Sequence, residues 1–224
     1  MNFEGEFSVD NLGETNTRTL YKRDANHKKK VFKLFGLFKK KKTIFEDQLN
    51  QLSELGIFMR ADLKKKLLLE EISRSEYEED PYNLLLLTLG GEVEVNDEFI
   101  NVSDKIWYLD TECIEDHGDY ARVIIRLENM TKLNLNKITD YVDISNSTVW
   151  VSFEYMNEFI RWEMKVEDDW LDMDIFRRLN ELTKTEQSMK LYISNLDQGC
   201  LVGYFNQEQV IELNKLTKYK FEEY

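Results

Sequence analysis

Residues Thr148–Val166 read TVWVSFEYMNEFIRWEMKV, and apolar side chains occupy every second position in two runs of this stretch. The apolar positions are Val149, Val151, Phe153, Tyr155, Ile160, Trp162, Met164 and Val166. A period of two is typical of β-strands with one buried face. Residues 156–158 are short enough for a tight turn, and strands joined so closely run antiparallel. The stretch therefore predicts a β-hairpin.

A second hairpin is predicted near the C-terminus, where SMKLYISNL and CLVGYF are separated only by DQG at residues 197–199. Elsewhere apolar residues recur three and four positions apart, which is typical of helices. The predicted helices lie at residues 43–56, 62–72, 81–90, 120–127, 172–182 and 206–216. The run Leu84–Leu87 also fits a buried strand, but the preceding Pro81 favours a helix.

Three of these helices carry capping signals at their N-termini. Thr43 with Glu46 has the spacing of a capping box, in which each side chain bonds to the other residue's backbone amide. Asn206 with Gln209 has the same spacing. Asp172 is a candidate N-cap because its carboxylate can accept from the amides of the first turn.

The elements together predict an α+β fold. Its N-terminal half is predicted to be helical, and its C-terminal half to hold a mixed, mostly antiparallel sheet with helices. The predicted domains are a basic, partly mobile N-terminal arm at residues 1–42 and one acidic α+β domain at residues 43–224. The chain has 224 residues, of which 42% are apolar, so it can form a sizeable hydrophobic core.

The composition favours a reduced, cytoplasmic protein. Cys113 and Cys200 lie far apart in the sequence and form no Cys-x-x-Cys motif. The first thirty residues are polar and mixed in charge, unlike a secretory signal. No apolar run approaches the roughly 18 residues that a membrane span needs.

Charge is distributed unevenly along the chain, whose net charge is −13. Residues 1–42 are basic, with eleven Lys or Arg and five Asp or Glu, whereas the remaining residues are strongly acidic. An acidic body repels phosphate backbones, so we expect no nucleic-acid partner for the main domain. The same charge would attract a basic protein and speed its encounter.

Residues 28–42 read KKKVFKLFGLFKKKK and combine lysine clusters with apolar and aromatic side chains. Such a segment can anchor a protein on an anionic membrane surface. It can also pack on the domain with its lysines in solvent, or place its lysines on the acidic body of the chain itself. The packed interpretation is favoured, and membrane contact stays an alternative.

Residues 107–120, WYLDTECIEDHGDY, place five carboxylates beside Cys113 and His117. The spacing of a calcium loop is absent, and a transition-metal site usually needs several His or Cys ligands. Cys113 and His117 lie four residues apart, but acidic neighbours raise the pKa of a thiol rather than lower it. We therefore predict no catalytic residue, metal ion or cofactor, and keep a metal-binding or hydrolytic enzyme centred on residues 110–119 as an alternative.

Some of these carboxylates can stabilise the start of the following helix through its dipole, and the surplus would form an acidic surface. A second acidic segment, VEDDWLDMD at residues 166–174, surrounds Trp170. An aromatic side chain among carboxylates is typical of protein-binding surfaces. The predicted partner-binding residues are Tyr108, Asp110, Glu112, Glu115, Asp116, His117, Asp119, Asp168, Asp169 and Trp170.

Four stretches of the chain resemble bacterial immunity-type proteins of polymorphic toxin systems: IFEDQLNQLSELGI, WYLDTECIEDHGDY, VEDDWLDMDIF and DQGCLVGYFNQEQVIELNKLT. The likeness covers much of residues 43–217, and none of the four stretches is a catalytic signature. The resemblance implies a cytoplasmic, non-enzymatic protein that binds and neutralises a toxin, often a basic nuclease or another secreted effector. A membrane-associated scaffold acting through residues 28–42 remains a further alternative.

Overall fold

The computed structural model describes residues 43–183 and 189–224, all of which belong to one compact unit, Lys42–Tyr224. The basic arm expected at residues 1–42, and the alternatives for residues 28–42, concern positions outside these ranges, so they stay predictions. Within the described ranges no helix has the length and apolar character needed to cross a lipid bilayer.

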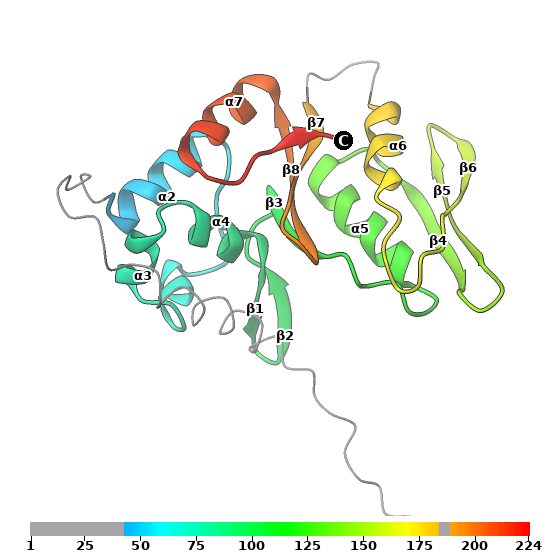
Figure 1. Ribbon diagram of the computed structural model, residues 1–224, viewed down its shortest axis with the longest axis horizontal. Helices are drawn as coiled ribbons and strands as arrows, with labels where there is room; N and C mark the ends of the chain where they lie inside the picture. The colour runs from blue at the N-terminus through cyan, green and yellow to red at the C-terminus, as the bar shows by residue number, and fades with distance from the viewer. Residues whose placement is uncertain (1–42, 184–188) are drawn as a thin grey trace, which may run out of the picture. The chain divides into compact units, whose positions relative to one another are not determined.

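A four-stranded antiparallel sheet of order β3-β8-β7-β9 organises this unit (Figure 1). Its strands are β3 (Ile106–Asp110), β7 (Met189–Asn195), β8 (Gly199–Asn206) and β9 (Glu222–Glu223). β8 pairs with β3 on one side and β7 on the other. Alternate β8 side chains enter two different cores, which explains why GCLVGYF is apolar without interruption.

One face of this sheet packs on what we call the helical core. The core includes Phe45, Leu52, Leu86, Leu201, Phe205 and Phe221. Its helices are α2 (Phe45–Glu54), α3 (Arg74–Glu79), α4 (Asn83–Gly90) and α7 (Gln207–Leu216), with the 3₁₀ helix η2 (Lys65–Leu69). At Gly90 a Cβ atom would lie 2.7 Å from the Tyr108 backbone nitrogen, so glycine lets α4 approach β3 closely.

The other face packs on what we call the sheet core, which includes Val123, Leu127, Val151, Phe153, Phe176 and Val202. Its helices α5 (Asp119–Thr131) and α6 (Asp174–Leu182) lie between the central sheet and a second antiparallel sheet (Figure 1). That sheet has the order β4-β5-β6, with bounds Asn136–Asp143, Thr148–Tyr155 and Glu158–Glu163. Both hairpins predicted from the sequence are confirmed.

The α+β class is confirmed, but the predicted helical N-terminal half is not well supported, because strands follow its helices. A hairpin of β1 (Glu92–Val95) and β2 (Glu98–Asn101) follows α4, and β3 comes directly after it. The helix predicted at residues 62–72 is reduced to η2. Lys64, just before η2, is extended, and the Tyr77 hydroxyl donates to the Leu68 carbonyl oxygen at 2.7 Å. That carbonyl therefore has a side-chain donor in place of a helical amide.

The capping predictions have mixed outcomes. The Thr43 capping box is wrong, because α2 begins at Phe45 without a side-chain cap and Glu46 pairs with Arg74 instead. α6 begins at Asp174, two residues after the predicted cap, although Asp172 Oδ1 still accepts from the Asp174 amide at 3.1 Å. The Asn206 capping box of α7 is confirmed in both directions.

We expect Asn206→Ala to lower the free energy of unfolding by about 1 kcal/mol. Asn206 Oδ1 accepts from the Gln209 amide at 2.9 Å, and Gln209 Oε1 accepts from the Asn206 amide at 2.9 Å. Alanine removes the first acceptor, whereas Asn206→Ser keeps one and should lose much less. Urea denaturation of both variants checks this, and equal losses would mean that packing rather than capping is responsible.

Candidate protein-binding surface

The fold brings the two acidic segments of the sequence together. The Cys113 and Ile114 amides both donate to the Asp169 carbonyl oxygen, at 3.0 and 2.9 Å. The Leu171 amide donates to the Thr111 carbonyl oxygen at 2.8 Å, and Glu112 faces Trp170 in an antiparallel β-bridge. The sequence predicted two separate acidic clusters, and this bridge joins parts of both into one surface.

We call this the bridge surface, and it consists of Asp110, Glu112, Asp168, Asp169, Trp170 and Asp172. A turn before Trp170 creates it. Asp168 has a left-handed backbone conformation, with φ of 54°, and the Trp170 amide donates to the Glu167 carbonyl oxygen at 3.1 Å. Aspartate tolerates this conformation better than most residues. The turn brings the backbone of Trp170 alongside Glu112, in the segment that follows β3.

In the described part of the chain, no ion pair neutralises the carboxylates of the bridge surface. Among residues 43–183 and 189–224, no lysine or arginine lies within ion-pair distance of its carboxylates. Those carboxylates belong to Asp110, Glu112, Asp168, Asp169 and Asp172. Glu112 has a neutral partner, since Gln198 Nε2 donates to its Oε1 at 3.0 Å. Such a concentration of unpaired charge attracts cations over a range set by the ionic strength.

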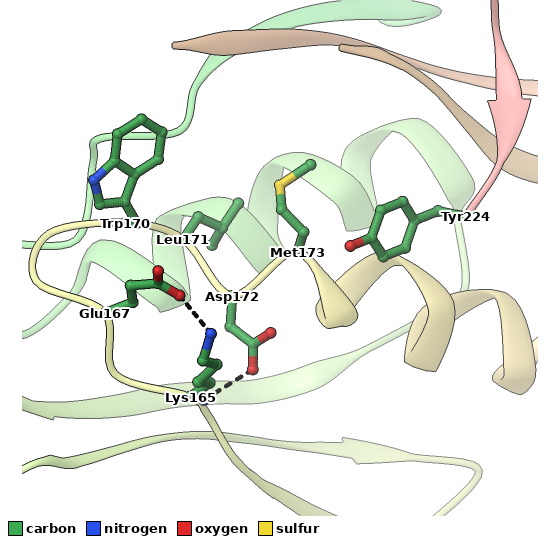
Figure 2. A pocket seen from close by; sticks show the side chains of 7 residues that line it. All are labelled: Lys165, Glu167, Trp170, Leu171, Asp172, Met173 and Tyr224. Atoms are coloured by element: carbon green, nitrogen blue, oxygen red, sulfur yellow. Dashed lines mark hydrogen bonds and ion pairs between the residues drawn. The ribbon is translucent and has the colours of Figure 1, made fainter. Parts of the chain in front are cut away.

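A hollow of about 210 Å³ lies at one end of the bridge surface. It is lined by Lys165, Glu167, Trp170, Leu171, Asp172, Met173 and Tyr224. Figure 2 shows the rings of Trp170 and Tyr224 on either side of Leu171 and Met173. Trp170 is 37% exposed and Tyr224 is 42% exposed, so both rings offer apolar surface to a ligand.

Asp172 is held firmly at the wall of the hollow. Its Oδ2 accepts from the Lys165 amide at 2.8 Å, and its Oδ1 accepts from the Asp174 amide. Its own amide donates to the Tyr120 hydroxyl at 2.9 Å. Burial raises the pKa of Tyr224, and the nearby carboxylates of Asp174 and Asp172 raise it further. The hollow therefore combines a fixed carboxylate, that of Asp172, with aromatic walls.

Glu115, Asp116, His117 and Asp119 do not join the bridge surface. Asp119 Oδ2 accepts from the Glu115 and Asp116 amides, at 2.8 and 2.9 Å, and Asp119 also pairs with Arg122. Glu115 and Asp116 are exposed. His117 Nδ1 accepts from the Val142 amide at 3.1 Å, so the imidazole faces the edge of β4.

The N-terminus of α5 is capped from a distant strand. Asp140 of β4 accepts from the Gly118 amide at 2.7 Å and from the Ala121 amide at 3.0 Å. Sequence reasoning gave this role to the carboxylates just before the helix, and it missed Asp140. The capping aspartate follows the helix in the chain, so no local motif indicates it.

Tyr108 lies apart from the hollow. Its side chain packs against the helical core, whereas its neighbour Leu109 enters the sheet core on the opposite face of β3. We therefore do not retain Tyr108 as an anchor for a partner, and Trp170 is the aromatic residue of the bridge surface.

Sequence reasoning also missed a row of stacked side chains on the outer face of the β4-β5-β6 sheet. The His117 ring lies 4.8 Å from the Tyr141 ring, which stacks 6.0 Å from Trp150, and the Arg161 guanidinium lies 4.3 Å from the Trp150 ring. Tyr141 is the direct cross-strand partner of Trp150. Alternation placed Trp150 and Arg161 on the exposed face, but their alignment with Tyr141 depends on strand register.

The chemistry of residues 110–119 offers no activated nucleophile. Burial raises the pKa of Cys113 to about 12, and the carboxylates of Asp110, Asp119 and Asp169 raise it although Arg122 opposes them. At neutral pH this residue is a thiol. In the described part of the chain, no three His, Cys, Asp or Glu side chains gather closely enough to hold a metal ion.

Comparison with known proteins gives no relatives for this chain, since it matches no protein-family model, no curated protein and no solved structure.

Proposed function

We propose that this protein is a non-enzymatic binding module that docks a basic protein domain on the bridge surface. The observation that supports this most is the joining of the two acidic segments through Glu112 and Trp170. It places five carboxylates, none with a lysine or arginine partner among residues 43–183 and 189–224, beside a partly exposed tryptophan and a hollow with a second aromatic ring.

The two kinds of side chain would have separate roles in binding. Unpaired carboxylates speed the encounter with a cationic partner and favour the correct orientation. A partly exposed tryptophan supplies apolar area whose burial contributes most of the lasting affinity, as at many binding hot spots. Nucleic acid is a poor candidate for the same surface because its phosphates would be repelled.

The resemblance to immunity-type proteins specifies the kind of partner further. If the protein is of this type, it works in the cytoplasm, and its partner is a toxin or another secreted effector domain of basic character. The acidic bridge surface suits such a partner, and binding alone would neutralise the toxin by covering its functional surface.

The proposal can be tested by measuring binding to the products of neighbouring genes, foremost any toxin encoded next to this chain. We expect Asp168→Asn with Asp169→Lys to lower affinity at least tenfold at low salt, which is about 1.4 kcal/mol. Asparagine at residue 168 tolerates the left-handed backbone, and Asp169 contributes only its carbonyl to the described hydrogen bonds. The difference should shrink at high salt because screening weakens charge attraction.

A matched control changes the same number of charges elsewhere. Glu54→Gln with Glu71→Lys alters two residues outside the bridge surface and leaves that surface intact. This control should keep the affinity of the original chain. Equal weakening by both double variants, or no binding of any neighbouring gene product at low salt, would contradict the proposal.

A further inference from the structure

The size of the hollow beside Trp170 restricts what can occupy it. Its volume of about 210 Å³ is below the usual range for small-molecule sites, about 300–1,000 Å³. The rings of Trp170 and Tyr224 both line the hollow, and both are partly exposed to solvent. Its dimensions suit one long side chain of a docked partner better than a free metabolite.

The lining of the hollow combines apolar and charged parts. Leu171 is buried at 4% exposure, and Met173 lies beside it between the rings of Trp170 and Tyr224 (Figure 2). These groups can cover the methylene stem of a long side chain. The ring faces can also attract a cationic head group through their electron density.

The charges of the hollow select a cation. Lys165 Nζ is bonded to Glu167, so its charge is compensated locally. Asp174 is similarly compensated by Arg177 and Arg178. The remaining carboxylate is Asp172, whose two oxygens each accept one backbone amide and retain further acceptor capacity.

Other occupants fit less well. An anionic side chain would meet the negative potential of Asp172 directly. A purely apolar side chain would remove water from Asp172 without replacing its hydrogen bonds, which is unfavourable. A guanidinium group has planar faces for the rings and paired N–H donors for a carboxylate, and an ammonium group lacks this planar fork.

We propose that the hollow between Trp170 and Tyr224 binds one arginine side chain of the protein partner, and that the Asp172 carboxylate pairs with the guanidinium group. This inference rests on the proposed function, because it identifies what the bridge surface recognises in its partner.

The test is an NMR titration of the full chain with a blocked arginine, N-acetyl-arginine methylamide, following the indole N–H signal of Trp170. The signal is assigned with Trp170→Phe. We expect a saturable shift with a Kd on the order of 1 mM, as suits a ligand of this size. The blocked citrulline compound, which has the same shape without the charge, should cause no saturable shift, and blocked lysine should bind more weakly.

Two variants locate the effect. Asp172→Asn should weaken binding of the arginine probe at least tenfold, whereas Glu115→Gln removes one exposed carboxylate outside the hollow and should leave binding of the probe unchanged.

Equal shifts with arginine and citrulline, no saturation well above the expected Kd, or equal losses of affinity in both variants would overturn the inference. If a basic partner binds through Asp168 and Asp169 while the arginine probe does not, only this inference fails. If no basic partner binds, the proposed function itself fails.

Discussion

In the native protein, Cys113 and Cys200 are expected to react with iodoacetamide near pH 7.5 about a thousandfold more slowly than in the unfolded chain. Burial raises the pKa of both thiols from 9.0 to about 12. Iodoacetamide reacts with the thiolate, and at neutral pH this higher pKa lowers the thiolate fraction about a thousandfold. Burial of Cys200, which is 0% exposed, should slow its reaction further.

The pH profile separates this effect from simple shielding. Below the pKa of a thiol, its rate rises about tenfold per pH unit because the thiolate fraction does. The rise should therefore level off near pH 9 for the unfolded chain and continue toward pH 12 for the native protein, as long as it stays folded. Mass spectrometry of Cys113→Ser and Cys200→Ser variants assigns each rate. Rapid native labelling of Cys113 at neutral pH would contradict this account and strengthen the alternative of a nucleophilic enzyme.

The elements that the sequence revealed best are those whose burial pattern is local. In β5 and β6 alternation alone identifies the face that packs on the sheet core, and the turn at Met156 and Asn157 has the positive φ values of a two-residue hairpin. The β1–β2 hairpin was missed although its turn, Asn96 and Asp97, has the same geometry. Residues 92–97, EVEVND, do alternate between polar and apolar side chains before a turn. The alternation is a weak strand signal, because each strand has only four residues and several of them are charged.

The candidate site was only partly within reach of sequence reasoning. The acidic and aromatic composition singled out Trp170, Asp168 and Asp169, because composition is visible without a fold. The β-bridge between Glu112 and Trp170 joins segments that are far apart in the chain, and no local propensity encodes such a contact. Tyr224 was missed for the same reason, since its ring reaches the hollow only through the pairing of β9 with β7.

The position of His117 also depends on tertiary structure that its local sequence does not reveal. Its spacing from Cys113 suggested a shared helix face, but residues 114–118 lie before α5 and form no helix. The loop instead follows the edge of β4, where the Val142 amide donates to the imidazole. His117, which looked like part of a catalytic or metal site, thus accepts a hydrogen bond from a backbone amide of β4. β4 is an edge strand, and edge strands commonly have backbone groups that lack a strand partner.

Gly203→Ala is expected to lower the free energy of unfolding by about 3 kcal/mol, at the upper end of the range for overpacked cores. Gly203 lies in the middle of β8, opposite Ile106 of β3 and Tyr192 of β7. A Cβ atom there would lie 2.0 Å from Cε2 of Phe205, so the ring would have to move. Phe205 is 1% exposed and packs edge-on against Phe221, which leaves the ring no open space to enter.

Backbone preference alone gives the opposite sign for this substitution. Replacing a glycine inside a strand by alanine should stabilise the chain by about 0.5–1 kcal/mol, so a measured loss isolates the steric clash. Urea denaturation of Gly203→Ala checks the sign, and the loss should shrink in a Phe205→Leu background, where the clashing ring is absent. Gly118→Ala is the matched control: nothing lies within 4 Å of its Cβ position, so its cost of about 1–2 kcal/mol should come from the φ of 99° alone. A Gly203→Ala protein as stable as the original chain would mean that the two cores are not packed tightly across β8, and the double-faced burial of that strand would have to be reconsidered.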